Sequence, residues 1–395
     1  MPKTQSQPKN WQEMKLGEIA QDIRELYEPT KKEEKPYIGL EHIEQQTLQL
    51  SGIGRSSETQ STKKVFNAGD ILFGTLRSYF RKVTMPKFDG VCSTDIAVIR
   101  PTEKGNGNFV KYFIANQEFI DHASNISSGT RMPRANWKIL KDQVWLFPKL
   151  TEQKGIGDVL VAYDDLIENN TRRIQILEQT AQAIYTEWFV NFRFPGHEKI
   201  KMVDSGSDFG KIPEGWEIKK LKDVVYNFDS KRRPISKMKR AQVQGEIPYY
   251  GAAKIIDYVN EVLLDGKYLL FAEDGSVITK EGYPVLQFVN EKFWVSNHAH
   301  VLQGKDVSTE HLYLTLSKFP IQGYVTGAAQ PKITQENMNR ISVLVSDANT
   351  RAEFDNRIQP LFELQFNLRI SLANLRQTRD LLLPKLVTGE IKVNT

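Results

Sequence analysis

The sequence predicts an α+β protein in which two mixed α/β domains alternate with two long helices, as a pseudo-two-fold internal repeat. Residues 149–192 and 347–390 carry the same helical pattern at a constant offset of 198 residues. In each copy, apolar residues alternate spacings of four and three, which is typical of a coiled-coil seam. Each copy follows a long block without this period. The chain is therefore expected to run as globule, helix, globule, helix.

The two helical copies are expected to pair as an antiparallel coiled coil, because one helix cannot bury its own narrow seam. The seam positions are Ile156, Leu160, Ile167, Asn170, Ile174, Leu177 and Ile184 in the first copy, and Leu368, Leu372, Leu375 and Leu382 in the second. Asn170, Gln365 and Arg379 are polar where apolar residues are expected. Such residues either set the register or are tolerated near frayed or bent parts. Pro360 predicts a kink in the second helix or its division into a short and a long helix.

The repeat extends beyond the helices. Trp11 matches Trp216 at an offset of 205 residues, and Pro133-Arg134 matches Pro331-Lys332 at an offset of 198. The block interiors hardly match, which is expected of a scaffold with two different binding surfaces, plain duplication being the alternative. The predicted boundaries are 1–148 for the first domain, 149–195 for the first helix, 196–212 for a linker, 213–346 for the second domain and 347–395 for the second helix.

Local patterns place short elements inside each domain. Short strands are predicted at residues 69–75, 92–100, 267–272, 275–279 and 293–295, where β-branched and aromatic residues are bounded by Gly, Asp or Asn. Short helices are predicted at 108–119 and 308–316. The linker is identified by its Gly, Ser and Pro residues, and Pro195-Gly196 is expected to end the first long helix. The order of the strands does not follow from these patterns.

Composition excludes several classes of protein. The apolar fraction of 40% and the charged fraction of 26% are those of a soluble globular chain, and the net charge of +5 is compatible with an anionic partner. No run of 18 apolar residues occurs, so no membrane span is predicted, and the first residues lack the apolar core of a signal peptide. Cys92 is the single cysteine, which excludes an internal disulfide and fits a reducing cytoplasm.

Motifs for catalysis are missing from the sequence. There is no GxxxxGK[ST] phosphate loop, no Asn-Pro-Pro-aromatic tetrad of the kind that grips a target amine, and no convincing carboxylate set for a nuclease. His298 and His300 have a strand-like spacing with no cysteine nearby, so an ordinary strand is favoured over a metal site. No catalytic, cofactor-binding or metal-binding residue is therefore predicted.

Basic segments are the strongest candidates for a binding function, because Arg and Lys contact phosphates and Arg also reads guanine. The candidates in the first domain are Arg77, Tyr79, Arg81, Lys82, Arg131 and Arg134. Those in the second domain are Lys231, Arg232, Arg233, Lys237, Lys239, Arg240, Gln330 and Lys332. Gln330 and Lys332 are included because they match the positions of Met132 and Arg134. The alternative for each segment is a solvated surface run.

The order of residues along the first helix is similar to that of a known family. The pattern comprises Pro148, Glu152, Gln153, Asp164, Glu178, Ala181, Tyr185, Trp188-Phe189, Phe192-Arg193-Phe194-Pro195-Gly196 and the seam residues, followed by Gly210, Pro213 and Gly215-Trp216. This pattern resembles the specificity subunit of type I restriction-modification enzymes. The second helix departs from it, because Ser346, Thr350 and Arg351 replace Pro148, Glu152 and Gln153, which puts a partner contact by that motif in doubt there.

The resemblance implies a division of labour between subunits. Two target-recognition domains would each read one half of a bipartite, asymmetric site on double-stranded DNA. The paired helices would act as a spacer and as the seat of two methyltransferase subunits, which use S-adenosylmethionine and flip out an adenine. Restriction subunits with ATP-driven translocation, magnesium and nuclease activity would dock on that core. This chain would itself hold no cofactor.

Two other functions are consistent with the residues. One is a self-contained DNA methyltransferase or nuclease with an unrecognised site. The other is a coiled-coil adaptor without a role on DNA. A methylation assay on the isolated chain separates the first from a specificity subunit, and salt-dependent DNA binding separates the second.

Overall fold

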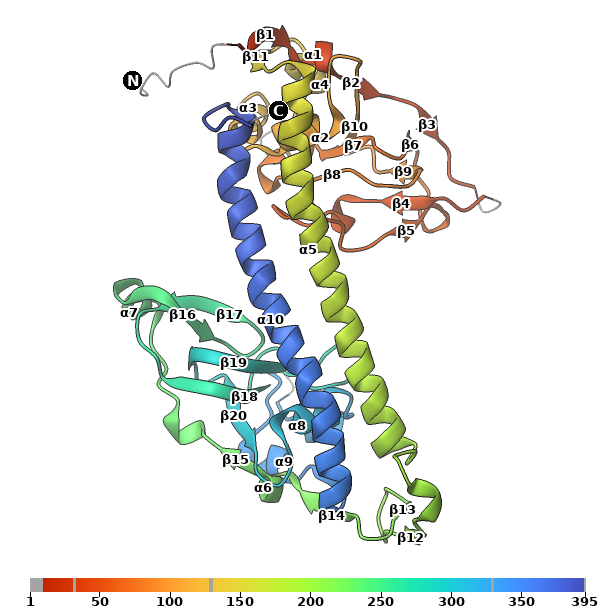
Figure 1. Cartoon of the computed structure of the whole chain (residues 1–395), viewed down its shortest axis with the longest axis vertical. Coiled ribbons are helices and arrows are strands. Elements are labelled where there is room, and N and C mark those ends of the chain that lie inside the picture. Colours follow the sequence, from red (N-terminus) through yellow and green to blue (C-terminus); the bar gives the residue numbers. More distant parts are fainter. Residues whose placement is uncertain (1–9, 31–32, 128–130, 328–329, 394–395) are drawn as a thin grey trace. The chain divides into compact units, whose positions relative to one another are not determined.

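The computed structural model describes residues 10–30, 33–127, 131–327 and 330–393. The chain forms two compact units, which we call unit 1 (residues 1–169 with 372–395) and unit 2 (residues 170–371). Each unit contains one mixed α/β region together with part of each long helix (Figure 1). The predicted fold class is confirmed.

Unit 1 is built on a four-stranded sheet in the order β2-β10-β7-β8 and a five-stranded sheet in the order β3-β6-β9-β4-β5, and β1 pairs with β11. The strands are β1 (Gln12–Lys15), β2 (Ala20–Ile23), β3 (Leu26–Tyr27), β4 (Pro36–Ile38), β5 (Gly54–Arg55), β6 (Lys63–Phe66), β7 (Ile71–Gly74), β8 (Val83–Thr84), β9 (Gly90–Cys92), β10 (Ile96–Pro101) and β11 (Val144–Phe147). The short helices are α1 (Leu16–Ile19), α2 (Gly107–Ala115), α3 (Gln117–Asn125) and α4 (Trp137–Leu140).

Unit 2 is built on a six-stranded sheet in the order β15-β20-β18-β19-β16-β17, with two separate pairs, β12-β13 and β14-β21. The strands are β12 (Met202–Asp204), β13 (Lys211–Pro213), β14 (Glu217–Lys220), β15 (Val225–Asn227), β16 (Gln244–Tyr250), β17 (Ile255–Val259), β18 (Leu264–Ala272), β19 (Leu286–Val295), β20 (Ala299–Gly304) and β21 (Ser342–Val345). The short helices are α6 (Leu221–Val224), α7 (Lys237–Gln242), α8 (Thr309–Ser317) and α9 (Gln335–Asn339).

Several predicted elements differ in detail from the structure. Residues 92–100 form two strands, because the chain turns where the Ile96 amide bonds the Ser93 carbonyl. Residues 275–279 form no strand, since Gly275 adopts a positive φ of 78° and only a single bridge joins Ile278 to Pro284. Residues 108–119 fall in two helices, α2 and α3. The expected linker contains the β12-β13 hairpin, with Gly206 and Gly210 at positive φ in its turn.

The long helices are α5 (Leu150–Tyr185, 36 residues) and α10 (Ala348–Val387, 40 residues), and a π-helical turn, Thr186–Val190, follows α5. The division of the second helix at Pro360 is wrong, because α10 continues through it. Pro360 lies on the exposed face, while Ile358 and Phe362 on the other face are buried in the unit 2 core. Their burial outweighs the one backbone hydrogen bond that proline removes.

Within each unit the two helices are antiparallel. In unit 2, Asn170 bonds Ser371 at 3.3 Å and Glu178 pairs with Arg369 at 2.8 Å. A later residue of α5 thus contacts an earlier residue of α10, as in an antiparallel pair. The seam residues Ile156, Leu160, Ile167, Asn170, Ile174 and Leu368 are buried, and Leu177, Ile184, Leu372, Leu375 and Leu382 are half-buried. Two of the polar seam residues bond the other long helix within their own unit, Asn170 to Ser371 and Arg379 to Asp164, which favours the interpretation that these two set the register.

Candidate nucleic-acid interface

A backbone bridge in unit 1 joins the two basic segments that the sequence singles out. Leu76 and Arg134 form an isolated β-bridge, the Ala135 amide bonds the Thr75 carbonyl at 3.0 Å, and the Arg77 amide bonds the Pro133 carbonyl at 2.8 Å. These contacts hold the segment after β7 beside the segment that precedes α4. Thr130, which belongs to the second basic segment, lies outside the described residues.

The segment after β7 is held in an uncommon conformation. Arg77 and Arg81 have positive φ angles of 53° and 51°, and a 3-10 turn, Ser78–Phe80, lies between them. Non-glycine residues in this region cost about 1–3 kcal/mol each and are found mainly at functional sites. The Ser78 hydroxyl lies 2.9 Å from that of Ser124 and anchors the turn on α3. Tyr79, in the middle of this turn, is 50% exposed.

The cations of unit 1 divide into exposed and internally bonded groups. Arg77 and Arg131 are exposed. Arg134 Nε donates to Asp95 Oδ1 at 2.9 Å while the Arg134 side chain stays 49% exposed. Lys82 Nζ donates to the Leu40 carbonyl, and burial lowers the pKa of Arg81, although Asp380 opposes this effect. Arg81 and Lys82 are therefore not part of the exposed group.

Thr75 and Arg134 also line a cleft of about 440 Å³ in unit 1. Two further cations, Arg24 and Lys64, line the same cleft together with Trp137. Arg24 and Lys64 are not among the residues predicted from the sequence, because neither belongs to a basic run and only the fold brings them to this cleft. Asp22 also lines the cleft and accepts from Arg24 Nε at 2.7 Å, and Lys64 Nζ donates to the Ile96 carbonyl at 2.7 Å, so both added cations are held by internal bonds.

Unit 2 repeats the bridge at an offset of 198 residues. Asp274 and Lys332 form the β-bridge, and the Ile333 amide bonds the Glu273 carbonyl at 2.8 Å. The Glu273 amide bonds the His298 carbonyl at 2.9 Å, as the Thr75 amide bonds the Asp95 carbonyl at 2.8 Å in unit 1. Gly275, the counterpart of Arg77, also has a positive φ, of 78°. The same backbone frame therefore carries different side chains in the two units.

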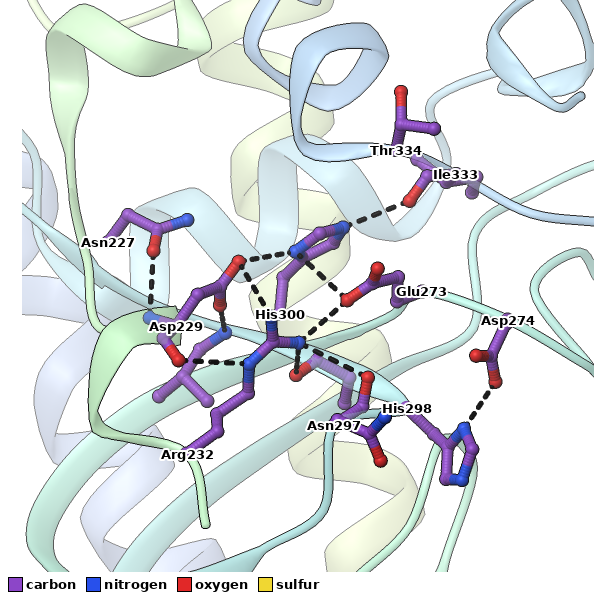
Figure 2. Close-up of polar contacts among 12 residues, drawn as sticks. Asn227, Asp229, Arg232, Glu273, Asp274, Asn297, His298, His300, Ile333 and Thr334 are labelled. Atoms are coloured by element: carbon purple, nitrogen blue, oxygen red, sulfur yellow. Dashed lines mark hydrogen bonds and ion pairs between the residues drawn. The ribbon is translucent and has the colours of Figure 1, made fainter. Parts of the chain in front are cut away.

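A cluster of charged side chains lies beneath the bridge of unit 2 (Figure 2). Arg232 donates to Glu273 at 2.6 Å and to the Ala299 carbonyl at 3.0 Å, and Lys332 pairs with Glu273 at 3.2 Å. His300 is buried and bonds Asp229 at 2.6 Å. Burial opposes the charged form of Glu273, but Arg232, His300 and Lys332 outweigh it and hold its pKa below the ordinary value. The cluster thus brings Arg232 and Lys332 together.

The basic run of unit 2 also divides into two groups. Arg240 is bonded internally, since its Nε donates to Asp257 at 2.8 Å and its guanidinium lies 4.9 Å from the Tyr249 ring. Lys231, Arg233, Lys237 and Lys239 are exposed, as is Gln330 on the neighbouring segment. The exposed members form the part of the run that is available to a ligand.

The two histidines of the His298-Ala-His300 segment have carboxylate partners. His300 Nδ1 faces Asp229, and His298 Nδ1 lies 2.6 Å from Asp274 Oδ1 with the His298 side chain 51% exposed. Among the described residues, no group of three or more His, Cys, Asp or Glu side chains has a metal-binding arrangement. The Asp274–His298 pair was not predicted from the sequence, although the offset of 198 from Leu76 points to Asp274.

The start of each long helix is tied to its own domain by equivalent contacts. In unit 1, Trp11 Nε1 donates to Glu152 at 3.2 Å, and Gln153 donates to the Pro148 carbonyl at 3.0 Å. In unit 2, Trp216 bonds Asp347, and Arg351 donates to the carbonyl of Ser346, the counterpart of Pro148. Arg351 therefore takes over one contact of Gln153, so the departure in sequence preserves this local geometry.

No helix in the described part of the chain is long and apolar enough to cross a membrane. The family whose model matches the chain is described as "Type I restriction modification DNA specificity domain", and the matches cover residues 8–179 and 213–349. Both bridges and the start of the first long helix lie within these matches, and the second match ends two residues before Arg351.

Individual relatives show the same likeness. The chain is 26% identical over 347 residues to the specificity subunit of the type I restriction enzyme MjaIX of Methanocaldococcus jannaschii, which covers 84% of this chain and 79% of the relative. It is 22% identical to the HindI specificity subunit of Haemophilus influenzae, over 97% and 100% of the two chains. A crystal structure of a type I S subunit from M. genitalium has a similar fold, with a TM-score of 0.64, 14% identity and coverage of 98% of each chain.

Proposed function

The chain belongs to the type I restriction-modification DNA specificity family, and from this premise we propose that its two recognition domains each read one half of a bipartite, asymmetric DNA site. Residues 1–148 would read one half and residues 213–346 the other. The observation that carries the proposal is the duplicated bridge: the bridge and the adjoining amide–carbonyl hydrogen bond recur at an offset of 198 residues with different exposed side chains. A shared frame with different side chains suits two domains that read different bases.

The exposed cations support binding to a duplex. The exposed Arg77 and Arg131 belong to the bridged segments of unit 1. In unit 2 the exposed Lys231 and Arg233 flank Arg232, which bonds Glu273 next to the bridge. Phosphate contacts of this kind supply most of the affinity of a DNA-binding protein and make it depend on salt. The bases would then be read by side chains that the fold holds in fixed positions.

Specificity subunits assemble with the other subunits of type I systems, and the long helices are the proposed seat for two methyltransferase subunits. Both helices leave large apolar side chains exposed. These are Leu166 and Ile176 on α5, and Leu364, Ile370 and Leu381 on α10. The methyltransferase subunits would supply S-adenosylmethionine chemistry on a flipped adenine, and restriction subunits would supply ATP-driven translocation and cleavage with magnesium.

Methylome sequencing of a host with and without this chain tests the proposal. We expect a bipartite adenine-methylation motif that is present with the chain and absent without it. The proposal would be contradicted if the host showed the same methylation motifs with and without the chain. Methyl transfer or DNA cleavage by the purified chain alone would favour a self-contained enzyme, and absence of salt-dependent DNA binding would favour an adaptor.

A further inference from the structure

We propose that Arg134 and His298 are the side chains that read bases in the two domains, each oriented by a carboxylate: Arg134 reads a guanine, and His298 reads the exocyclic amino group of an adenine or a cytosine. The inference rests on the proposed function and assigns a role to individual residues within it. It separates these two side chains from the exposed lysines and arginines that contact phosphate.

The two side chains lie in the same backbone frame. In unit 1, Arg134 forms the bridge with Leu76, and the Asp95 carbonyl accepts a hydrogen bond from the Thr75 amide at 2.8 Å. In unit 2, Asp274 forms the bridge with Lys332, and His298 occupies the position of Asp95, since its carbonyl accepts the Glu273 amide at 2.9 Å. In each unit an exposed side chain on this frame is thus paired with a carboxylate on the same frame.

The pairing of Arg134 with Asp95 uses only Nε, so the two terminal nitrogens of the guanidinium remain available to a ligand. Asp95 accepts from Nε at 2.9 Å, and neither terminal nitrogen of Arg134 has a hydrogen-bond partner in the described ranges. Asp95 is itself fixed, because its carbonyl also accepts from the Thr75 hydroxyl at 2.7 Å. A fixed fork of two donors matches the O6 and N7 acceptors of guanine in the major groove.

The pairing of His298 sets which ring nitrogen carries hydrogen. An ionised carboxylate only accepts hydrogen bonds, so the 2.6 Å contact with Asp274 Oδ1 requires a hydrogen on His298 Nδ1. In the neutral ring, Nε2 is then a bare acceptor. Figure 2 shows the His298 and Asp274 side chains set apart from the buried cluster around His300. An acceptor at this place selects the amino donors of adenine N6 or cytosine N4.

The test uses the complex of this chain with its methyltransferase subunits and selects bound DNA from a pool with randomised half-sites. Arg134→Ala is expected to reduce the preference for guanine at one position of one half-site by about tenfold or more. His298→Ala is expected to remove the preference for an amino-bearing base at one position of the other half-site. The salt dependence of binding should stay unchanged in both.

Asp274→Asn tests the role of the carboxylate as a positioning group. An asparagine amide can donate to His298 Nδ1, which permits the hydrogen on Nε2 instead. The preference at that one position should then shift towards bases with acceptors, guanine or thymine. A merely structural role for Asp274 would lower affinity for all sequences without changing the preferred base. Arg134→Lys and His298→Gln serve as second variants if the alanine variants do not fold.

Lys237→Ala is the matched control, since this exposed lysine is expected to contact phosphate. It should weaken binding to all sequences alike and flatten the salt slope by about one. Provided that the wild-type complex selects a bipartite site, two results would overturn the inference. One is a uniform loss of affinity with a flatter salt slope in the Arg134 or His298 variants. The other is an unchanged base preference in these variants. Failure of the wild-type complex to select such a site would instead contradict the proposed function.

Discussion

Asp164, on α5, accepts hydrogen bonds from three buried side chains of unit 1. Lys111 Nζ lies at 2.6 Å, the Tyr112 hydroxyl at 2.7 Å and Arg379 Nη1 at 2.8 Å. Burial opposes the charged form of Asp164, but Lys111 and Arg379 outweigh it and hold its pKa below the ordinary value. Arg379, a polar residue in the seam, thus has a specific partner on the other helix of the same unit.

Replacing Asp164 by Asn is expected to destabilise unit 1 by about 3 kcal/mol, because the buried Lys111 would lose its counter-charge and the buried Arg379 would keep only Asp380. Since the pKa of Asp164 is lowered on folding, its contribution is present above the ordinary carboxyl pKa of 3.8 and is lost as pH falls through the lowered value. Urea unfolding at neutral pH measures the loss. Asp165→Asn, whose side chain is 57% exposed, is the control and should change stability by less than about 1 kcal/mol. Equal effects would contradict the argument.

His311, on α8, is a buried histidine among aromatic rings of unit 2. Its ring lies 4.4 Å from that of Phe189 and 5.0 Å from that of Phe354, and neither ring nitrogen has a hydrogen-bond partner in the described chain. Burial, with a smaller contribution from Arg351, lowers the pKa of His311 to about 3.

The His311 pKa predicts a loss of stability in mild acid. The unfolded chain takes up a proton near the ordinary pKa of 6.5 and the folded chain does not, so stability is full above 6.5 and falls between 6.5 and about 3. The contribution of His311 should lower the free energy of unfolding by about 2 kcal/mol between pH 7.5 and pH 5. His311→Phe and His311→Gln should both lose less stability than wild type over this range in urea unfolding. A wild-type pH dependence in both variants would show that His311 is not buried in the neutral form.

The basic run of unit 2 is predicted to act through its exposed members. The double variant Lys231→Ala with Arg233→Ala should weaken DNA binding on all sequences and flatten the salt slope by about one per lost contact. Arg232→Ala should instead lower the thermal stability of unit 2, because Glu273 loses one cation and three backbone carbonyls lose a hydrogen-bond donor. Binding titrations at several salt concentrations, with thermal unfolding of each variant, separate the two roles. Unchanged affinity and salt dependence would assign Lys231 and Arg233 to a solvated surface.

Helix α5 begins in close contact with α2. A Cβ atom on Gly157 would lie 2.8 Å from Asn108 Cβ and 2.9 Å from Asn106 Oδ1, the atom that caps α2 by accepting the Phe109 amide. Gln153 lies four residues earlier, and its side-chain oxygen accepts a hydrogen bond from the Asn106 amide at 2.9 Å. The contact between the two helices therefore depends on the absence of a side chain at residue 157.

Gly157→Ala is expected to destabilise unit 1 by about 1–3 kcal/mol, since overpacking at a tight contact outweighs the better helix propensity of alanine. Thermal unfolding measures the change. Gly323→Ala is the control, because no atom lies within 4 Å of its added Cβ. An increase in stability for Gly157→Ala would show that α2 shifts to accommodate the methyl group.

At the scale of the whole chain, the repeat predicts that DNA recognition is modular. Replacing residues 213–346 with the equivalent domain of the MjaIX specificity subunit should change one half of the methylation motif and leave the other half as it was. The reason is that the bridge and helix contacts are repeated in each unit, so each recognition domain is supported by its own frame. Methylome sequencing of a host with the chimaera provides the measurement, and the wild-type chain in the same host is the control. Changes in both halves would contradict modular reading.

The sequence by itself determined the fold class, the duplication and the two long helices. Helical periodicity is a local property, so a seam such as Ile156, Leu160 and Ile167 is legible without knowledge of its partner. The division predicted at Pro360 does not occur, because the packing of Ile358 and Phe362 is a tertiary contribution that exceeds the loss of one hydrogen bond. The break at Ser93 has a different cause, because it is a local turn in which the Ile96 amide bonds the Ser93 carbonyl.

Only the tertiary structure decided which cations are available to DNA. A basic run in sequence does not show which of its members face a carboxylate, because the acids that bind Arg134, Arg232 and Arg240 come from distant segments. Asp95 is 39 residues from Arg134, and Glu273 is 41 residues from Arg232. The pairing of His298 with Asp274 likewise arises from the meeting of two strand ends. Ion pairs form between groups that the fold brings within a few ångströms, and that proximity is not encoded in the local pattern.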